Sequence, residues 1–251
     1  TNGSAKTIFT QNILGKSCGQ VCPTSVLCEG ACVYHDLNEK PIDIGRLQAY
    51  ATGHAIDNNI RFFEKGKSTG KKVAVIGAGP AGIACAHELT VLGHKVVVYE
   101  ANKKAGGLNM YGVAPYKFSN KDAIQEVKYV SDIGFEIKTN SPVTDVSELE
   151  KEFDAIFLGA GLGGSRKLNI PGEDLKGVYG ATEFIHDLRE KDLKVNVGKE
   201  VVVVGGGNTA IDAAVESSLL GANVTVIYRR SENEQSAYSF EIEHEKKNEV
   251  K

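Results

Sequence analysis

The sequence predicts an α/β protein with two dinucleotide-binding units, each built on a parallel sheet, after a small α-helical domain rich in cysteine. Three observations support this fold class. A glycine-rich turn lies between two apolar runs in residues 72–100, a similar arrangement returns in residues 200–228, and four cysteines crowd into residues 18–32. We expect a cysteine-rich domain of the iron–sulfur type, an FAD-binding domain and an incomplete NAD(P)-binding domain, at residues 1–66, 67–180 and 181–251.

The first glycine-rich turn joins an apolar strand to a helix-compatible stretch. Its first glycine allows a tight turn, its second lets a pyrophosphate approach the backbone, and its third lets the helix pack on the sheet. The helix N-terminus then offers free N–H groups and a partial positive charge to the phosphates. Glu100 ends the next strand, where its carboxylate can accept both ribose hydroxyls. The expected cofactor contacts are Gly77, Gly79, Pro80, Ala81, Gly82 and Glu100.

The second turn is a copy of the first. A shift of 128 residues places Gly77 on Gly205 and Gly79 on Gly207, whereas the third glycine becomes Ala210. A period this long that occurs once indicates a duplicated dinucleotide-binding unit rather than a solenoid.

The two copies differ in charge at the end of their second strand. The first has Glu100, and the second has Tyr228 followed by Arg229 and Arg230. A carboxylate favours a free 2′-hydroxyl, whereas a pair of guanidinium groups favours a 2′-phosphate. The first copy therefore suits FAD or NAD and the second suits NADP(H), which implies electron transfer between two cofactors.

The four clustered cysteines are Cys18, Cys22, Cys28 and Cys32, with the spacing C-x3-C-x5-C-x3-C. Thiolates are the usual ligands of iron–sulfur clusters, and the proline after Cys22 is common in such sites. A zinc site is a second interpretation, although structural zinc sites usually have C-x2-C pairs. Small buried thiols in a helical segment are a third. Cys85 stands alone in the first phosphate-binding helix and is expected in the core.

Composition excludes several classes of protein. The chain is 41% hydrophobic and 24% charged with a net charge of −3, which gives no reason to expect nucleic acid as a partner. It has no apolar run of about 18 residues, so we expect no membrane span. The N-terminus lacks the layout of a signal peptide, and the five cysteines suit thiols or metal ligands in the cytoplasm.

Several further elements follow from the hydrophobic pattern. A helix after Pro41 is expected to bury Ile44, Leu47, Tyr50 and Ala51. Residues 64–71 form a linker, and backbone N–H groups of Gly106 and Gly107 are expected to face a ligand. The other expected helices and strands are helices at 121–134, 182–191 and 236–251 and strands at 135–138 and 153–158.

The order of motifs resembles one family across essentially the whole chain. The motifs are SCGQVCPTSVLCEGAC, PIDIGRLQAYA, VIGAGPAG, FDAIFLGAG, IPGEDLKGV and VVVVGGGNTAIDAA. They resemble the NAD(P)H/FAD electron-input module of dihydropyrimidine dehydrogenase and of the glutamate synthase small subunit. The CPTSVLC motif followed by GRLQ favours the dihydropyrimidine dehydrogenase branch.

The resemblance implies iron–sulfur ligands. Cys22, Cys28 and Gln48 would serve one [4Fe-4S] cluster and Cys32 a second, whereas Cys18 would not be a ligand. The family's upstream cysteines are absent before Thr1, and its closing FAD segment is absent after residue 251. We therefore expect a chain truncated at both ends.

The resemblance also implies where the nucleotides bind. FAD would lie on the first turn, near Gly107 and Leu108, with Lys117 in place of the usual arginine. In place of a further basic residue the second copy has Ser236, which leaves NAD(H) possible. The residues implied for NADP(H) are Gly205, Gly207, Asn208, Thr209, Arg229 and Arg230.

The implied activity is that of an NAD(P)H-dependent flavoprotein oxidoreductase. Electrons would pass from NAD(P)H through FAD, and through iron–sulfur clusters in the complete protein, to a partner subunit or domain that reduces pyrimidines. A glutamate-forming partner is the alternative within the family. A scaffold that no longer binds flavin is an alternative of a different class. No catalytic side chain is expected, since the cofactors supply the chemistry.

Overall fold

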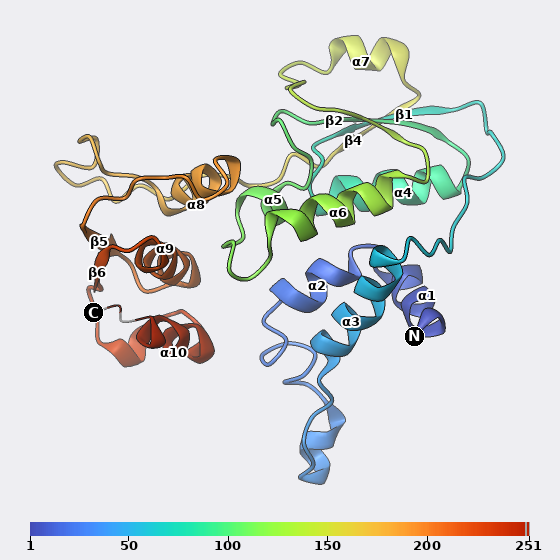
Figure 1. The fold of residues 1–251 in the computed structure, drawn as a ribbon. Helices are drawn as coiled ribbons and strands as arrows, with labels where there is room; N and C mark the ends of the chain where they lie inside the picture. Colours follow the sequence, from blue (N-terminus) through green and yellow to red (C-terminus); the bar gives the residue numbers. More distant parts are fainter. Residues whose placement is uncertain (249, 251) are drawn as a thin grey trace. The chain divides into compact units, whose positions relative to one another are not determined.

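The computed structural model describes residues 1–248 and 250. The chain divides into two compact units, each described here by itself (Figure 1). The first comprises Thr1–Met110 and Lys117–Gly161, and the second comprises Tyr111–Tyr116 and Leu162–Lys251.

The first unit begins with the helices of the cysteine-rich segment, of which α2 contains Cys18. They are α1 (Asn2–Gln11), α2 (Gly15–Val21), the 3-10 helix η1 (Val33–Leu37) and α3 (Ile44–Asp57). Helices α2 and α3 approach closely at two glycines, because a Cβ on Gly19 would lie 2.5 Å from the Gly45 carbonyl oxygen. Ala51 is buried as expected, but Leu47 and Tyr50 are 57% and 69% exposed. The expectation that Leu47 and Tyr50 are buried was therefore wrong. The buried face of α3 consists of small residues such as Gly45 and Ala55 instead.

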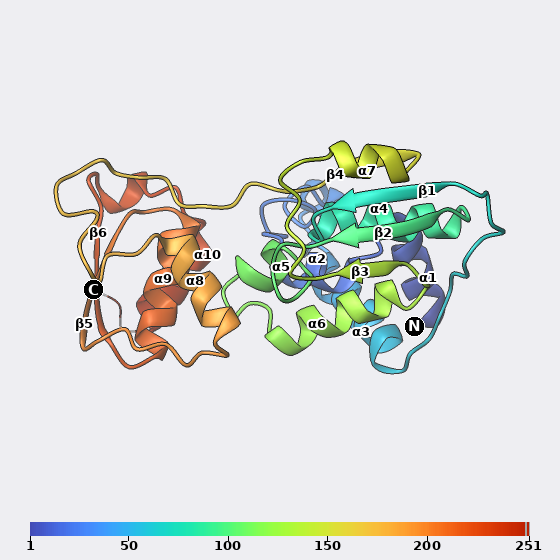
Figure 2. The ribbon, with the colours of Figure 1, turned by 90° about the horizontal axis from the view of Figure 1, so that it is seen from above.

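A parallel four-stranded sheet forms the centre of the first unit, in the order β3-β2-β1-β4. Helices α4 and α6 cover one face of the sheet and α7 lies on the other (Figures 1 and 2). The two central strands are buried, because each has neighbours on both sides. The bounds of these elements are β1 (Lys72–Ile76), α4 (Pro80–Val91), β2 (Lys95–Tyr99), α5 (Leu108–Tyr111), α6 (Asn120–Ser131), β3 (Glu136–Lys138), α7 (Ser147–Glu152) and β4 (Ala155–Leu158).

The second unit contains two parallel strands, β5 and β6. Helix α9 buries Ile211 and Val215 completely. The strands alternate in burial, so that Val202 and Ile227 are 59% and 52% exposed. The bounds are α8 (Ala181–Glu190), β5 (Glu200–Val204), α9 (Asn208–Leu219), β6 (Asn223–Ile227), the 3-10 helix η2 (Glu232–Glu234) and α10 (Ser239–Lys247).

Helix α2 is fixed to α6 through charged side chains. The carboxylate of Glu126 accepts the backbone N–H of Ser17 at 2.9 Å, in the first turn of α2. Lys16 Nζ lies 2.6 Å from Asp122 Oδ1. Burial raises the pKa of Glu126, and the N–H groups of Ser17 and Lys16 oppose that rise. The first turn of α2 therefore has its free donors satisfied from another helix.

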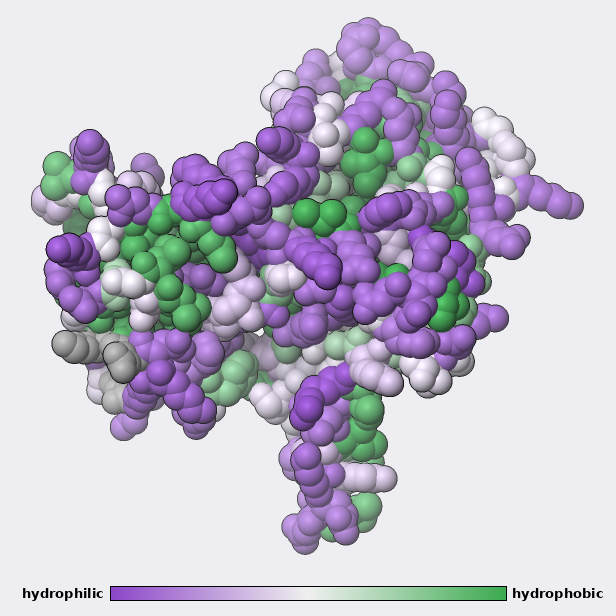
Figure 3. Space-filling view, in the orientation of Figure 1, coloured by the Kyte–Doolittle hydropathy of each residue, from purple (hydrophilic) through white to green (hydrophobic). Residues whose placement is uncertain are grey.

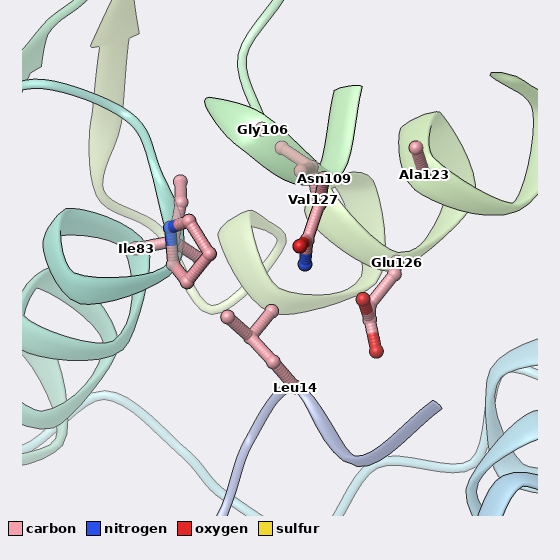
Figure 4. A pocket seen from close by; sticks show the side chains of 8 residues that line it. Leu14, Ile83, Gly106, Asn109, Ala123, Glu126 and Val127 are labelled. Carbon is pink, nitrogen blue, oxygen red and sulfur yellow. The ribbon is translucent and has the colours of Figure 1, made fainter. Parts of the chain in front are cut away.

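Beside Glu126 lies a cavity of about 10 Å³, which is about the space of one water molecule. Figure 4 shows the side chains of Glu126 and Asn109 around this space, with Leu14 and Ile83 opposite. A cavity this small does not hold a cofactor.

The expected strands at 135–138 and 153–158 and the expected helices at 121–134 and 182–191 are confirmed within a few residues. The helix expected at 236–251 occupies Ser239–Lys247, and residues 249 and 251 lie outside the described residues. Cys85 packs against the core, and burial raises its pKa. No helix in the described part of the chain is both long and apolar enough to cross a bilayer.

Candidate cofactor and metal sites

Cys22, Cys28 and Cys32 lie on the segment between α2 and α3, and Cys18 lies within α2. Cys22 caps the C-terminus of α2, and Cys32 precedes η1. Glu29, which lies between them, accepts the backbone N–H of Gly45 at 2.9 Å and so binds the segment to the first turn of α3. The chain thus holds three of the predicted ligands on one short, fastened loop.

The thiols lie close enough to influence one another. Cys18 Sγ and Cys22 Sγ are 3.9 Å apart. Burial raises the pKa of Cys22, and the neighbouring Cys18 and Cys28 raise it further. The structure therefore also brings Cys18, which the resemblance excludes as a ligand, next to Cys22.

Gln48, the predicted ligand that is not a cysteine, lies on α3. Its Nε2 donates to the Gly15 carbonyl oxygen at 2.9 Å, which fixes the carboxamide. Its Oε1 has no hydrogen-bond partner among residues 1–248 and 250. The fit to a metal cluster is therefore good at this position, because the atom left over is the one that donates lone pairs.

In the described part of the chain, one group of three ligand-type side chains lies within 4.8 Å, and it contains no cysteine. It consists of His186, Asp187 and Glu190 on the surface of α8. His186 stacks on Tyr111 at 4.6 Å, and Asp187 binds Lys191 at 2.6 Å. Side-chain contacts therefore account for this group.

The first glycine-rich turn has the geometry that its sequence predicts. Gly77 has a φ of +97°, which a residue with a Cβ rarely adopts. A Cβ on Gly82 would lie 1.9 Å from the Gly77 carbonyl oxygen, so the helix packs as close as the motif requires. A Cβ on Gly79, by contrast, would meet nothing nearer than Gly107 Cα at 3.7 Å. Gly79 N-caps α4, and the turn is less crowded at Gly79 than at Gly82.

Glu100 directly follows β2 and is 5% exposed. Its Oε2 accepts the N–H of Ala78 at 2.9 Å, inside the glycine-rich turn. Its Oε1 accepts both the backbone N–H and the side-chain N–H of Asn102, at 2.8 and 2.9 Å. Asn102 was not predicted from the sequence, although an asparagine two residues after an acid is a common local hydrogen-bonding pattern.

The Gly106-Gly107 loop packs against this turn. A Cβ on Gly107 would lie 2.5 Å from Gly79 Cα. The N–H of Gly106 donates to the Ala78 carbonyl oxygen at 2.8 Å, so the expectation that it faces a ligand was wrong. Leu108 begins α5 and is 52% exposed, and Lys117 lies between α5 and α6.

The second turn repeats the first with small changes. Gly205 N donates to Ile227 O at 3.0 Å, as Gly77 N does to Tyr99 O at 2.8 Å. Gly207 N-caps α9, and Thr209 is exposed at the start of that helix.

Residues of the loop that follows β6 make hydrogen bonds to this second turn and to the end of β6. Asn208 Oδ1 accepts the backbone N–H of Tyr238 at 2.9 Å. Ser236 Oγ lies 3.5 Å from the Gly206 carbonyl oxygen. Tyr228 OH donates to Glu234 O at 3.0 Å. Arg229 and Arg230 are exposed, and neither makes an ion pair with a residue that the structure describes.

A buried polar group in the second unit was also not predicted. Tyr116 OH donates to Asp212 at 2.7 Å, and Tyr116 N–H donates to Glu216 at 3.1 Å. Burial raises the pKa of Tyr116 far above its ordinary value, and the carboxylates of Asp212 and Glu241 add to the rise. The hydrogen bonds join residues about 100 positions apart, so no local pattern in the sequence could reveal them.

The fold and the turns define the class of protein. Residues 71–251 match the family model of the pyridine nucleotide-disulphide oxidoreductases, and the chain belongs to this family. Residues 1–60 match the model described as dihydropyrimidine dehydrogenase domain II, 4Fe-4S cluster. The sequence-based fold class, resemblance and cofactor types, FAD, NAD(P)H and [4Fe-4S], are thereby confirmed.

Curated relatives make the similarity more specific. The chain is 37% identical over 236 residues to the glutamate synthase [NADPH] small chain of Escherichia coli (strain K12), which covers 88% of this chain and 50% of that one. It is 33% identical over 231 residues to an NAD-dependent dihydropyrimidine dehydrogenase subunit PreT homolog of Salmonella typhi, covering 90% of this chain and 55% of that one. The chain thus spans about half the length of the curated relatives it matches.

Solved structures show the same fold. Mycobacterium tuberculosis FprA in complex with NADPH aligns with a TM-score of 0.57 at 24% identity, over 69% of this chain and 46% of that one. A 2-naphthoyl-CoA reductase aligns with a TM-score of 0.62 at 26% identity, over 94% of this chain and 37% of that one.

Proposed function

We propose that the protein takes electrons from NADPH, in preference to NADH, and passes them through FAD and [4Fe-4S] clusters to a partner protein. The observation that supports this most is the repeated turn with opposite chemistry at one position. Glu100 is a buried carboxylate, whereas Arg229 and Arg230 are exposed guanidinium groups. One repeat therefore suits a free ribose and the other a ribose phosphate.

The residues of the first turn would hold FAD. Gly79 and the N-terminus of α4 would receive the pyrophosphate, Glu100 the ribose, and Leu108 with Lys117 would lie towards the ring system. The chemistry that bound FAD supplies is the conversion of a two-electron hydride transfer into single-electron steps. The protein binds and orients the nucleotide, and Asn102 keeps the Glu100 carboxylate in place.

The residues of the cysteine segment would hold the clusters. Cys22, Cys28 and Gln48 would bind one cluster and Cys32 another. The fixed carboxamide of Gln48 supports this assignment. The division into domains at residues 1–66, 67–180 and 181–251 and a cytoplasmic location belong to the same proposal, because thiol ligands persist in a reducing compartment.

The final acceptor would be a pyrimidine-reducing partner. The family model matched by residues 1–60 supports this choice. A glutamate-forming partner is the second candidate, favoured by the higher identity to a glutamate synthase small chain. Apolar side chains on the cysteine segment support a contact with some partner, since Val33 and Leu37 are each 63% exposed. Figure 3 shows apolar residues along this segment.

The test is the optical spectrum of the anaerobically purified protein, followed by titration with FAD and then NADPH. We expect flavin absorbance, cluster absorbance when the remaining cluster ligands are supplied, and bleaching of the flavin band on addition of NADPH. A protein that takes up no FAD would instead be a scaffold. Cys28→Ser should lower the iron content, whereas the matched Cys18→Ser should not. Co-purification with each candidate partner subunit distinguishes the two acceptors.

A further inference from the structure

A second cavity in the first unit lies away from the nucleotide turn. It has a volume of about 320 Å³ and is lined by side chains from α4, from the end of α6 and from residues 61–65. The residues of the first glycine-rich turn, Gly77 to Gly82, do not line this cavity, and neither does Glu100. Its size is at the lower end of the range of small-molecule sites, which is about 300–1,000 Å³.

His87 is the unusual residue of this cavity. It is 5% exposed, and its ring meets the edge of Phe63 at 5.1 Å. Neither ring nitrogen makes a hydrogen bond within residues 1–248 and 250. Burial lowers the pKa of His87 to about 4, so at neutral pH the imidazole is uncharged, with one N–H donor and one nitrogen acceptor.

The other repeat shows that the fold does not need a histidine here. The residue of α9 that corresponds to His87 is Val215, which is fully buried. An aliphatic side chain thus satisfies the packing of this helix. The ring nitrogens of His87 are not among the fully buried polar atoms without a partner in the described residues, so they keep accessible surface, and His87 lines the cavity, where water or a ligand can bond to them.

The charges at the rim are already compensated. Arg61 pairs with Asp132 at 2.7 Å, donates to the Tyr129 carbonyl oxygen, and stacks over the Tyr129 ring at 4.3 Å. The hydroxyl of Tyr129 donates to Ile60 O at 2.6 Å. Glu64 and Lys65, which are exposed at the rim, have opposite charges. The lining of the cavity therefore holds two basic and two acidic residues and carries no net charge.

We propose that this cavity binds a small uncharged aromatic molecule that carries one hydroxyl or ring N–H group, and that His87 is its hydrogen-bonding partner. An aromatic ligand suits the side chains of Phe62 and Phe63, whereas the ring of Tyr129 already contacts Phe9 and Arg61. An anion would find neither a free guanidinium nor a charged imidazole, and the exposed ammonium group of Lys65 has the carboxylate of Glu64 next to it in the chain.

The test uses 4-methylphenol as the probe, toluene as its apolar counterpart and 4-hydroxybenzoate as its charged counterpart. Binding is followed by NMR of the His87 ring in the whole chain. We expect a saturable shift of the His87 signals with 4-methylphenol, and affinity about tenfold higher than for toluene, the ratio that one neutral hydrogen bond gives. 4-Hydroxybenzoate should bind more weakly than 4-methylphenol.

His87→Val copies the other repeat and should abolish the preference for 4-methylphenol over toluene, while the control His54→Gln should retain it. If His87→Val does not fold, the wild-type titration still decides. The proposal is overturned if 4-methylphenol causes no saturable shift of the His87 signals, because a cavity that holds only water gives that result. Equal affinity for toluene and 4-methylphenol, or a preference for the anion, overturns it as well.

Discussion

The two repeats share a backbone and differ in what surrounds it. β1, α4 and β2 have the same lengths as β5, α9 and β6, and pairing starts at equivalent residues, Lys72 with Lys95 and Glu200 with Asn223. In the first repeat the strands are buried, whereas in the second alternate residues are exposed. The comparison teaches that the local sequence determines this backbone, whereas the residues around it set the burial of each repeat and the charge at the end of its second strand.

The largest effect is expected at the third position of the turn. Gly82→Ala should destabilise the first unit by about 3 kcal/mol or more, because the new Cβ would meet the backbone of Gly77 rather than a movable side chain. Urea unfolding measures the change. The matched variant Ala210→Gly should lower the free energy of unfolding by about 1 kcal/mol, because glycine is less favourable than alanine in a helix by that amount. Equal costs would mean that the two helices lie equally close to their strands.

The next effect is expected at the end of the second strand. Glu100→Gln replaces an acceptor with an amide nitrogen at Ala78 or Asn102, and a buried donor left unpaired costs about 1–3 kcal/mol. We expect FAD to bind at least about tenfold more weakly in a titration of the apo protein. The corresponding variant Tyr228→Phe loses one hydrogen bond and should leave FAD affinity unchanged. If Glu100→Gln binds FAD normally, Glu100 does not contact the ribose.

The double variant Arg229→Ala/Arg230→Ala should reduce the preference for NADPH over NADH by about tenfold. This factor corresponds to a difference in binding free energy of roughly 1.4 kcal/mol. The loss should be smaller at high salt, because exposed charges are screened. Binding of both nucleotides to wild type and variant at two salt concentrations measures it. Unchanged NADPH affinity would show that these arginines are exposed to solvent and do not contact the nucleotide.

The smallest effect concerns Glu216 of α9, which is 3% exposed, whereas its counterpart Glu88 in α4 is exposed. Burial raises the pKa of Glu216 above the ordinary 4.5. A raised pKa means that the folded protein retains the proton to higher pH than the unfolded chain. The stabilising contribution is therefore complete below the unfolded pKa and declines as the pH rises through the folded pKa.

Glu216→Gln should thus match wild type in unfolding free energy at low pH and exceed it increasingly as the pH rises above about 4.5, the unfolded value. Urea unfolding at several pH values provides the measurement. Glu88→Gln, at the equivalent exposed position of α4, is the matched control for the substitution itself. A Glu216→Gln curve parallel to wild type would contradict the inferred protonation.

The sequence predicts the parts of the site that depend on local geometry. The glycines and the acid after β2 follow from spacing, because a tight turn and a short strand leave few choices. Contacts between distant segments could not be predicted in this way. Glu126 reaches Ser17 across 109 positions, and Tyr116 reaches Glu216 across 100. The exposed Leu47 and Tyr50 were missed because helical periodicity indicates an apolar face without indicating what covers it.

The attachment of α2 to α6 limits how freely the segments of this family can be exchanged. The two matched family models meet between residues 60 and 71, and that boundary suggests a natural point for fusing one relative's cysteine segment to another's nucleotide domain. The hydrogen bonds and ion pair of α2 cross it, however, from Lys16 and Ser17 to Asp122 and Glu126. A chimera therefore has to inherit both acids together with the cysteines, or the helix that presents Cys22 begins without its anchor.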